Sequence, residues 1–205
     1  ICCGGVPLTA EYTRQVAEFA CAHEMALHLD GARIFNAAAA LGVPAAVLTA
    51  PVDSVTFCLS KALCAPVGSV LCGSAEFIAK AKRLRKMVGG GVRQAGILAA
   101  AGIIGIEEMV EKLPEDHRRA RALASGLQEI PGLILETPVP ASNMVFMALS
   151  DEVHFSARQV AEKMAKRGVM VGVVGERRFR VVTHHWITDA GVNQTIEAFR
   201  AVLQG

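Results

Sequence analysis

The sequence predicts an α/β fold, in which short apolar strands alternate with helices. Apolar runs of strand length, such as residues 54–59 and 69–72, are followed within a few residues by stretches with helical periodicity. The loops between them are short, and alternation of this kind is typical of a mostly parallel sheet with right-handed crossovers. The 205 residues are 52% hydrophobic and 20% charged, which favours a well-buried globular protein over a disordered chain.

Capping residues and periodicity place the helices. Thr9, Ser74 and Thr188 are predicted N-caps, and Gly42 and Gly168 are expected to end the helices that precede them. We expect helices over residues 9–23, 36–41, 75–87, 94–112, 115–128, 156–167 and 189–203. The helix that follows the triple glycine is apolar nearly all round and is therefore expected to be buried.

Apolar runs bounded by turn residues place the strands. We expect strands over residues 25–29, 54–59, 69–72, 133–135, 144–149, 169–174 and 179–182. The run over 54–59 carries no charge, so we expect it to be buried on both faces. The short strand over 69–72 is also expected to be buried. The composition changes after the helix expected over residues 115–128, where prolines 131, 138 and 140 break the chain. We expect two domains, residues 1–112 and 113–205, of which the second is a small α/β domain.

Ionisable side chains follow two of these strands at their carboxyl ends. Lys61 comes just after the strand over 54–59, and Asp30 and Arg33 follow the strand over 25–29. Open α/β sheets bind their ligands at this end of the strands. A lone lysine there is most often a solvated loop residue, and Asp30 with Arg33 is equally well explained as a local ion pair. Together the three side chains define a candidate site.

These three side chains suit a cofactor that carries an aldehyde. A lysine amine forms a Schiff base with an aldehyde when burial or a nearby cation lowers its pKa. Pyridoxal phosphate uses this chemistry, and its ring nitrogen needs an acidic partner to stay protonated. Asp30 would supply that carboxylate, and Arg33 would hydrogen-bond the phenolic oxygen of the ring.

Three stretches of the sequence resemble the threonine aldolases, which are pyridoxal phosphate enzymes of the aspartate aminotransferase fold type. In family order they are HLDGARIFNAAAALGV (28–43), DSVTFCLSKALCAPVGSVLCGS (53–74) and RLRKMVGGGVRQAGILAAAG (83–102), and the similarity continues to FRVVTH (179–184) and the terminal helix. The resemblance implies the second half of a transferase-like large domain, with a mostly parallel sheet and helices on both faces. A small C-terminal α/β domain would follow it.

The sequence departs from the family pattern Ser-Lys-Gly-Leu-Gly-Ala-Pro at two positions. Ala62 and Cys64 stand where the family has glycine. A side chain at a position with φ above zero costs about 1 kcal/mol, so either residue would strain the backbone if the turn needs that conformation.

The resemblance implies further roles on either side of the triple glycine. Lys86 precedes residues 89–91 and Arg93 follows them, and in the family the corresponding side chains approach the cofactor phosphate from a neighbouring subunit. Taken alone, the glycines are better explained as a flexible joint between two helices. The basic residues over 80–86 are explained as a solvated helix face.

A third role implied by the resemblance concerns the substrate. Arg180 matches the family arginine that is thought to bind the substrate carboxylate, for which a guanidinium fork is well suited. Taken alone, Arg180 would be explained as an exposed residue of an edge strand. His184 is a further candidate, although the sequence departs from the family at His185 and Trp186.

The activity that the resemblance implies is the cleavage of L-threonine or L-allo-threonine to glycine and acetaldehyde. Lys61 would carry the cofactor, Asp30 would keep its ring nitrogen protonated and Arg180 would fix the carboxylate. No residue present is an obvious base for the hydroxyl proton. Two alternatives stay open: another enzyme of the same fold type, such as a serine hydroxymethyltransferase or an eliminating lyase, and an inactive chain that acts at most as an oligomerisation partner. The expected assembly is a homodimer or homotetramer with shared active sites.

Composition argues against other classes of partner. The net charge of +2 is too small to indicate nucleic-acid binding, and no apolar run has membrane-spanning length. None of the six cysteines forms a Cys-x-x-Cys pair, so we expect reduced thiols in a reducing compartment. No metal site is expected, because His184 and His185 are neighbours and would point to opposite faces of a strand.

The first residues are typical of a turn between elements. Ile1 is followed by Cys2, Cys3, Gly4 and Gly5. By the resemblance, about the first half of the enzyme lies outside this sequence, including a Ser-Gly-Thr phosphate-binding segment. No signal peptide is recognised, and we expect a cytoplasmic protein, with a mitochondrial location also compatible.

Overall fold

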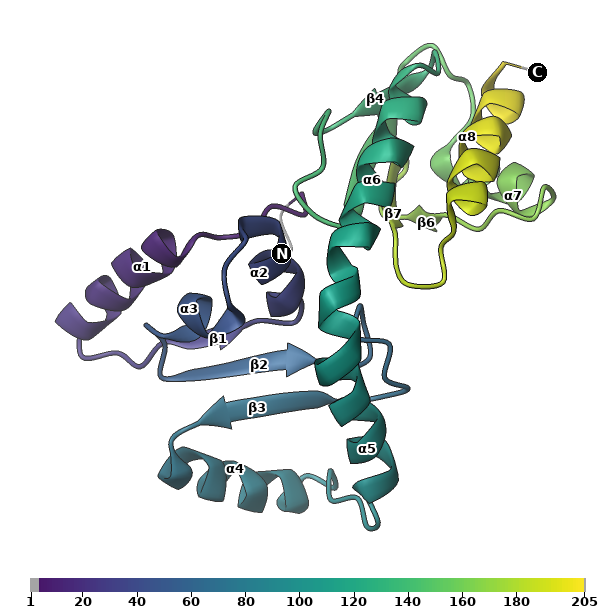
Figure 1. The fold of residues 1–205 in the computed structure, drawn as a ribbon. Helices are drawn as coiled ribbons and strands as arrows, with labels where there is room; N and C mark the ends of the chain where they lie inside the picture. Colours follow the sequence, from purple (N-terminus) through teal and green to yellow (C-terminus); the bar gives the residue numbers. More distant parts are fainter. Residues whose placement is uncertain (1–3, 205) are drawn as a thin grey trace. The chain divides into compact units, whose positions relative to one another are not determined.

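A computed structural model describes residues 4–204 (Figure 1). The chain divides into two compact units. Unit 1 is Leu8–Glu111, and unit 2 comprises residues 112–204 together with residues 4–7. Each unit has its own sheet and its own hydrophobic clusters.

Unit 1 combines a three-stranded sheet with helices. Its helices and strands are α1 (Ala10–Ala22), β1 (His28–Asp30), α2 (Ile34–Leu41), α3 (Ala45–Thr49), β2 (Ser54–Cys58), β3 (Ser69–Gly73), α4 (Ala75–Met87) and α5 (Gly96–Ile104). A π-helical turn, Gly105–Met109, and a 3₁₀ turn, Val110–Lys112, follow α5. Most of these bounds agree with the sequence, whereas the short α3 was not expected.

Side-chain caps fix where two of these helices begin, as the sequence predicts. The Thr9 hydroxyl accepts a hydrogen bond from the Tyr12 N–H (3.1 Å) at the start of α1. The Ser74 hydroxyl accepts one from the Phe77 N–H (3.2 Å) at the start of α4. Each cap satisfies an N–H group that has no partner within the first helical turn.

The prediction for the first strand was wrong in its bounds. It placed the strand over 25–29, whereas β1 covers His28–Asp30 and includes the acid itself. The residues that follow α1 form the turn that ends this helix, rather than the start of a strand. The Met25 N–H donates to the Ala20 carbonyl (2.9 Å), and Glu24 adopts a left-handed φ of 53°. Because of this turn, β1 begins only at His28.

The sheet of unit 1 mixes the two strand directions. β1 pairs with β2 in parallel, with Asp30 opposite Thr56, and β2 pairs with β3 in antiparallel fashion. In Figure 1 the arrows of β2 and β3 accordingly run in opposite directions. A mostly parallel sheet was expected. The connection from Cys58 to Ser69 is shorter than the dozen or so residues that a crossover needs, so β3 turns back beside β2.

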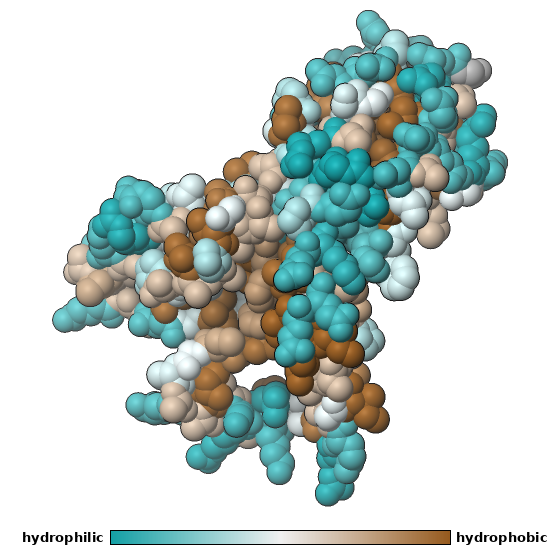
Figure 2. All heavy atoms as spheres, viewed as in Figure 1, coloured by the Kyte–Doolittle hydropathy of each residue, from teal (hydrophilic) through white to brown (hydrophobic). Residues whose placement is uncertain are grey.

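The predictions of burial in unit 1 were wrong for three elements. In β2 only Ser54 is buried and the other residues are half-buried, and both ends of β3 are exposed. In α5 only Gly102 is buried, and Ile97 is 81% exposed. Within unit 1 these elements are covered on one side only, so their apolar residues reach the surface, as Figure 2 shows over α5.

Unit 2 is built on an antiparallel sheet of order β4-β5-β7-β6. Its helices and strands are α6 (Leu113–Gln128), β4 (Leu133–Leu135), β5 (Met144–Leu149), α7 (Ala157–Ala165), β6 (Gly172–Val173), β7 (Arg178–Val182) and α8 (Asp189–Leu203). Ser156 and Thr188 cap α7 and α8. Every element of this unit was predicted, and the largest difference is that β6 is shorter than expected.

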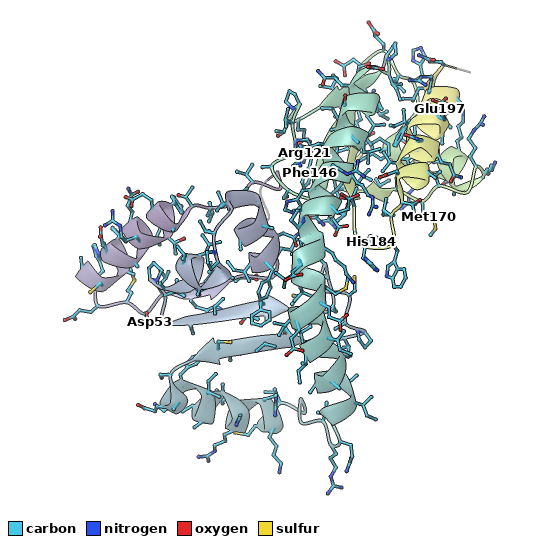
Figure 3. The ribbon with its side chains drawn as sticks, in the orientation of Figure 1. Asp53, Arg121, Phe146, Met170, His184 and Glu197 are labelled. Atoms are coloured by element: carbon cyan, nitrogen blue, oxygen red, sulfur yellow. The ribbon has the colours of Figure 1, made fainter. Side chains whose placement is uncertain are left out.

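The core of unit 2 lies between the sheet and its three helices. Phe179 of β7 and Phe199 of α8 are fully buried and meet edge to face, with ring centroids 5.6 Å apart. Side chains alternate along a strand, so Arg180 lies on the opposite face of β7 and is exposed. Its partner on β5 is Phe146, which is labelled in Figure 3.

A buried histidine makes the stability of unit 2 dependent on pH. His117 of α6 is 3% exposed, and burial together with the positive charge of Arg121 lowers its pKa from 6.5 to about 4. Between these two values the unfolded chain binds a proton that the folded chain does not. The contribution of His117 is therefore complete above pH 6.5 and is lost as the pH falls through about 4, by roughly 3 kcal/mol in total.

We expect the variant His117→Gln to lose this part of the pH dependence. Urea denaturation followed by the fluorescence of Trp186, the single tryptophan, reports on unit 2. The unfolding free energy of the original chain should fall more steeply between pH 7 and pH 4 than that of the variant. Parallel pH profiles of the two proteins would contradict the assignment.

Candidate functional site

The candidate site lies at the carboxyl ends of β1 and β2. Asp30 is the last residue of β1, and Lys61 follows the last residue of β2 by three positions. The two strands are parallel neighbours, and the Gly31 N–H donates to the Thr56 carbonyl (2.8 Å) just beyond β1. The structure thus brings the ends of the two strands together, as the sequence predicts. Asp53, labelled in Figure 3, precedes β2 at its opposite end.

Backbone hydrogen bonds hold the turn that carries Lys61. The Leu59 N–H donates to the Gly68 carbonyl (2.9 Å), the Cys64 N–H to the Lys61 carbonyl (3.0 Å) and the Ala65 N–H to the Leu59 carbonyl (3.1 Å). Leu59 and Ala65 are buried, whereas Lys61 is exposed. Among residues 4–204 its ammonium group has no hydrogen-bond or ion-pair partner. The turn therefore presents an exposed lysine side chain at the end of β2.

Two glycines let α5 and the following π-helical turn approach the Lys61 turn closely. A Cβ atom at Gly102 would lie 2.9 Å from a methyl carbon of Leu59. At Gly105 it would lie 2.8 Å from the Leu63 carbonyl oxygen, a distance that real Cβ atoms essentially never show. Met109, one helical turn further on, packs with Leu59 and Leu63 in the same cluster. Thus α5 and the π-helical turn pack against the Lys61 turn through backbone atoms as well as through side chains.

One of the two residues that depart from the family pattern has a strained backbone conformation. Cys64 has a left-handed φ of 58°, whereas Ala62 is not left-handed. The cost expected from the sequence therefore applies to Cys64 alone. We expect Cys64→Gly to stabilise unit 1 by about 0.5–1 kcal/mol, because the relief of strain exceeds the loss of a half-buried thiol.

The control for Cys64 lies two residues away. Ala62→Gly adds freedom to the unfolded chain and removes a buried methyl group, so it should destabilise unit 1 by about 1 kcal/mol or more. Urea denaturation followed by circular dichroism would measure both changes, and the fluorescence of Trp186 in unit 2 should respond to neither. A loss of stability in Cys64→Gly would contradict the explanation.

Asp30 and Arg33 surround the start of α2. The Asp30 carboxylate is exposed and accepts a hydrogen bond from the Ala32 N–H (3.1 Å). Arg33 is the half-buried N-cap residue of α2. The cavity beside them measures only about 60 Å³, well below the roughly 300 Å³ of small ligand sites. This cavity of unit 1 is therefore too small to hold a cofactor ring.

The remaining candidates lie on other elements. Lys86 ends α4, and Arg93 follows the glycines before α5; both are exposed. No hydrogen bond or ion pair within residues 4–204 joins either side chain to Lys61 or Asp30. In unit 2, Arg180 makes no ion pair with another described residue, and His184 lies in the loop after β7 (Figure 3). The roles of these residues stay predictions.

The contacts of His28 near the site were not predicted from the sequence. The His28 ring contacts the hydroxyls of Ser54 and Thr56 on β2. Alternation along β1 would have placed His28 on the same face as Asp30. Its partners, however, depend on the register between the two strands, which the local pattern does not contain.

The residues present fit a cofactor with an aldehyde and a ring nitrogen. An unpartnered lysine on a rigid turn and an exposed carboxylate on the next parallel strand are the two groups that pyridoxal phosphate requires. The described residues contain no cluster of three or more His, Cys, Asp or Glu side chains that could hold a metal ion. Cys21, Cys58, Cys64 and Cys72 form no disulfide among the described residues, and Cys2 and Cys3 lie outside them.

No helix within residues 4–204 combines the length and apolar character needed for a membrane crossing.

The fold and the two strand ends define an α/β protein with a lysine-centred candidate site. The chain belongs to the beta-eliminating lyase family, whose model matches residues 1–150. Low-specificity L-threonine aldolase 1 of Arabidopsis thaliana is 42% identical over 98% of this chain and 56% of its own length. The low specificity L-threonine aldolase of Escherichia coli K12 is 39% identical over 97% of this chain and 57% of its own length. These matches confirm the resemblance indicated by the sequence motifs.

Solved structures show the same fold at lower identity. The threonine aldolase of Leishmania major superimposes with a TM-score of 0.74 at 19% identity, covering 96% of this chain and 57% of that one. Ureidoglycine-glyoxylate aminotransferase of Bacillus subtilis gives a TM-score of 0.67 at 16% identity, covering 94% and 56%. The predicted fold class is thereby confirmed. The chain spans a little over half the length of the relatives it matches.

Proposed function

We propose that this chain is part of a pyridoxal phosphate-dependent aldolase that cleaves L-threonine and L-allo-threonine to glycine and acetaldehyde. The observation that carries the proposal is that Lys61 and Asp30 lie at the carboxyl ends of two neighbouring parallel strands, β2 and β1. The aldolases of Arabidopsis thaliana and Escherichia coli support the choice of reaction.

The residues of the chain would divide the work between cofactor and substrate. Lys61 would attach the cofactor through its amine, Asp30 would hold the proton of the ring nitrogen and Arg33 would donate to the phenolic oxygen. When bound, pyridoxal phosphate supplies an electron-withdrawing ring. Arg180 would hold the substrate carboxylate in a bidentate fork, which orients the bond to be broken.

The overall reaction needs no oxidant or reductant. The Cα–Cβ bond of threonine breaks, the hydroxyl proton leaves and Cβ becomes the carbonyl carbon of acetaldehyde. Cα takes up a proton to give glycine. We assign no residue of this chain as the base that removes the hydroxyl proton.

We also propose that the active enzyme is a homodimer or homotetramer with shared active sites. Lys86 and Arg93 are exposed and unconnected to Lys61 within the chain, which suits side chains that serve a neighbouring subunit. In that arrangement both would meet the cofactor phosphate, where two cations are favourable.

Two measurements on the chain test the proposed function. After incubation with pyridoxal phosphate, reduction with borohydride followed by peptide mass spectrometry should find the pyridoxyl group on Lys61. With L-threonine as substrate, acetaldehyde and glycine should appear in equal amounts. Absence of the label on Lys61 would overturn the proposal and favour an inactive chain.

The description of the matching family, beta-eliminating lyase, names a second candidate activity. Loss of a β-substituent from a cofactor-bound amino acid, followed by hydrolysis, would release pyruvate and ammonia and would use the same lysine. A label on Lys61 together with pyruvate from L-serine, and no acetaldehyde from L-threonine, would support that activity instead.

A further inference from the structure

His28 and Asp30 lie on the same face of the unit 1 sheet. Side chains alternate along β1, and the parallel register places Ser54 opposite His28 and Thr56 opposite Asp30. Leu29, between them, faces the other way and joins the hydrophobic cluster of α2 and α3. The face that carries the candidate acid is therefore polar.

The His28 ring connects β1 to β2 on this face. Its Nδ1 lies 2.9 Å from the Ser54 hydroxyl oxygen, and its Nε2 lies 3.3 Å from the Thr56 hydroxyl oxygen. A neutral imidazole has one N–H donor and one acceptor nitrogen, and hydroxyl groups can serve either. One ring thus bridges two residues of β2, and we call this arrangement the His28 bridge.

The His28 bridge acts where the backbone pairing is short. β1 has three residues, and the Gly31 N–H to Thr56 carbonyl bond (2.8 Å) is the contact that follows Asp30. A shift of one residue between two strands moves every side chain to the opposite face. Such a shift would take Asp30 off the face that it shares with Thr56.

We propose that His28 is a positioning residue of the cofactor site, which holds β1 in register on β2 and so keeps Asp30 beside the end of the strand that leads to Lys61. The inference rests on the proposed function, because the need for Asp30 at this place comes from the cofactor. His28 itself touches neither cofactor nor substrate in this assignment.

Binding of pyridoxal phosphate and hydrogen exchange together test the inference. We expect His28→Ala to weaken cofactor binding about five- to tenfold, since two hydrogen bonds are lost. The Gly31 amide should exchange faster by a similar factor, because its bond to Thr56 opens more often. Both measurements are independent of turnover.

Conservative variants separate positioning from general stability. In His28→Gln the amide group reaches the place of Nε2 beside Thr56, so most of the cofactor affinity and the protection of Gly31 should return. His23→Ala removes the other histidine near β1, which contacts the carbonyl and the ring of Phe19 in α1, and should change neither quantity.

The outcomes distinguish this inference from the proposed function. If the original chain binds the cofactor on Lys61 and His28→Ala binds it equally well, the positioning role is wrong and the function stands. If the original chain binds no cofactor, the function and the role of His28 in it both fail. Faster exchange of Gly31 in His28→Ala would still support the bridge as the contact that fixes the register.

Discussion

Replacing Lys61 with alanine is expected to abolish the attachment of pyridoxal phosphate and to lower acetaldehyde release from L-threonine on the order of a thousandfold or more. This lysine lies in a hydrogen-bonded turn after β2, the parallel neighbour of the strand that ends in Asp30. The ammonium group has no partner within the described residues, so its removal breaks no ion pair. The fold should therefore survive the change.

Two further variants make the Lys61 experiment specific. Lys61→Arg keeps the positive charge but has no amine of comparable reactivity, so it should also lose the borohydride-stable label. Lys82→Ala removes an exposed lysine of α4 and should keep both label and activity. Circular dichroism melting would show that all three proteins are folded. A label that persists in Lys61→Ala would place the cofactor on another residue.

Replacing Phe179 with alanine is expected to destabilise unit 2 by about 3–5 kcal/mol. The ring is fully buried, and it meets Phe199 edge to face in the centre of the core. Truncation would leave a cavity between β7 and α8. The unfolding of unit 2 in urea, followed by Trp186 fluorescence, would measure the loss.

Three other variants define the origin of the Phe179 effect. Phe179→Leu keeps most of the volume and should cost no more than about 1.5 kcal/mol. A double-mutant cycle with Phe199→Leu should give a coupling of about 0.5–1.5 kcal/mol for the aromatic contact. Val139→Ala alters a side chain that is 66% exposed and should change stability by at most about 0.5 kcal/mol.

The Phe179 variants also test the proposed role of Arg180 in substrate binding. Arg180 follows Phe179 in β7 and lies on the other face of that strand, so the core holds the strand that presents the guanidinium. At temperatures where unit 2 of Phe179→Leu stays folded, we expect the KM for L-threonine to rise more than kcat falls. Equal changes in both would argue against a role of Arg180 in substrate binding.

The elements of unit 2 could be predicted from the sequence because local signals suffice there. Ser156 and Thr188 cap their helices, and the prolines and glycines separate strands that carry clear alternation. Unit 1 was harder. The closing turn of α1 displaced β1, and the five residues of α3 are too few for a periodic pattern.

The candidate site was predicted as far as single strands define it. Asp30 and Lys61 follow apolar runs, and the structure places both at one edge of the sheet. The His28 bridge was missed, because contact between residues 26 or 28 positions apart depends on register rather than on local pattern. The roles of Lys86, Arg93 and Arg180 come from the family resemblance, since no local pattern tells which distant elements meet.

Gly102 and Gly105, which pack against the Lys61 turn, occupy positions where a side chain has no room. Gly105 faces the Leu63 carbonyl with no side chain between the two backbones, and Gly102 faces the side chain of Leu59. A side chain at either position would therefore collide with the loop that carries Lys61, and at Gly105 the collision would be with its backbone. The position of Lys61 at the end of β2 thus depends on two residues of a later element that have no side chain.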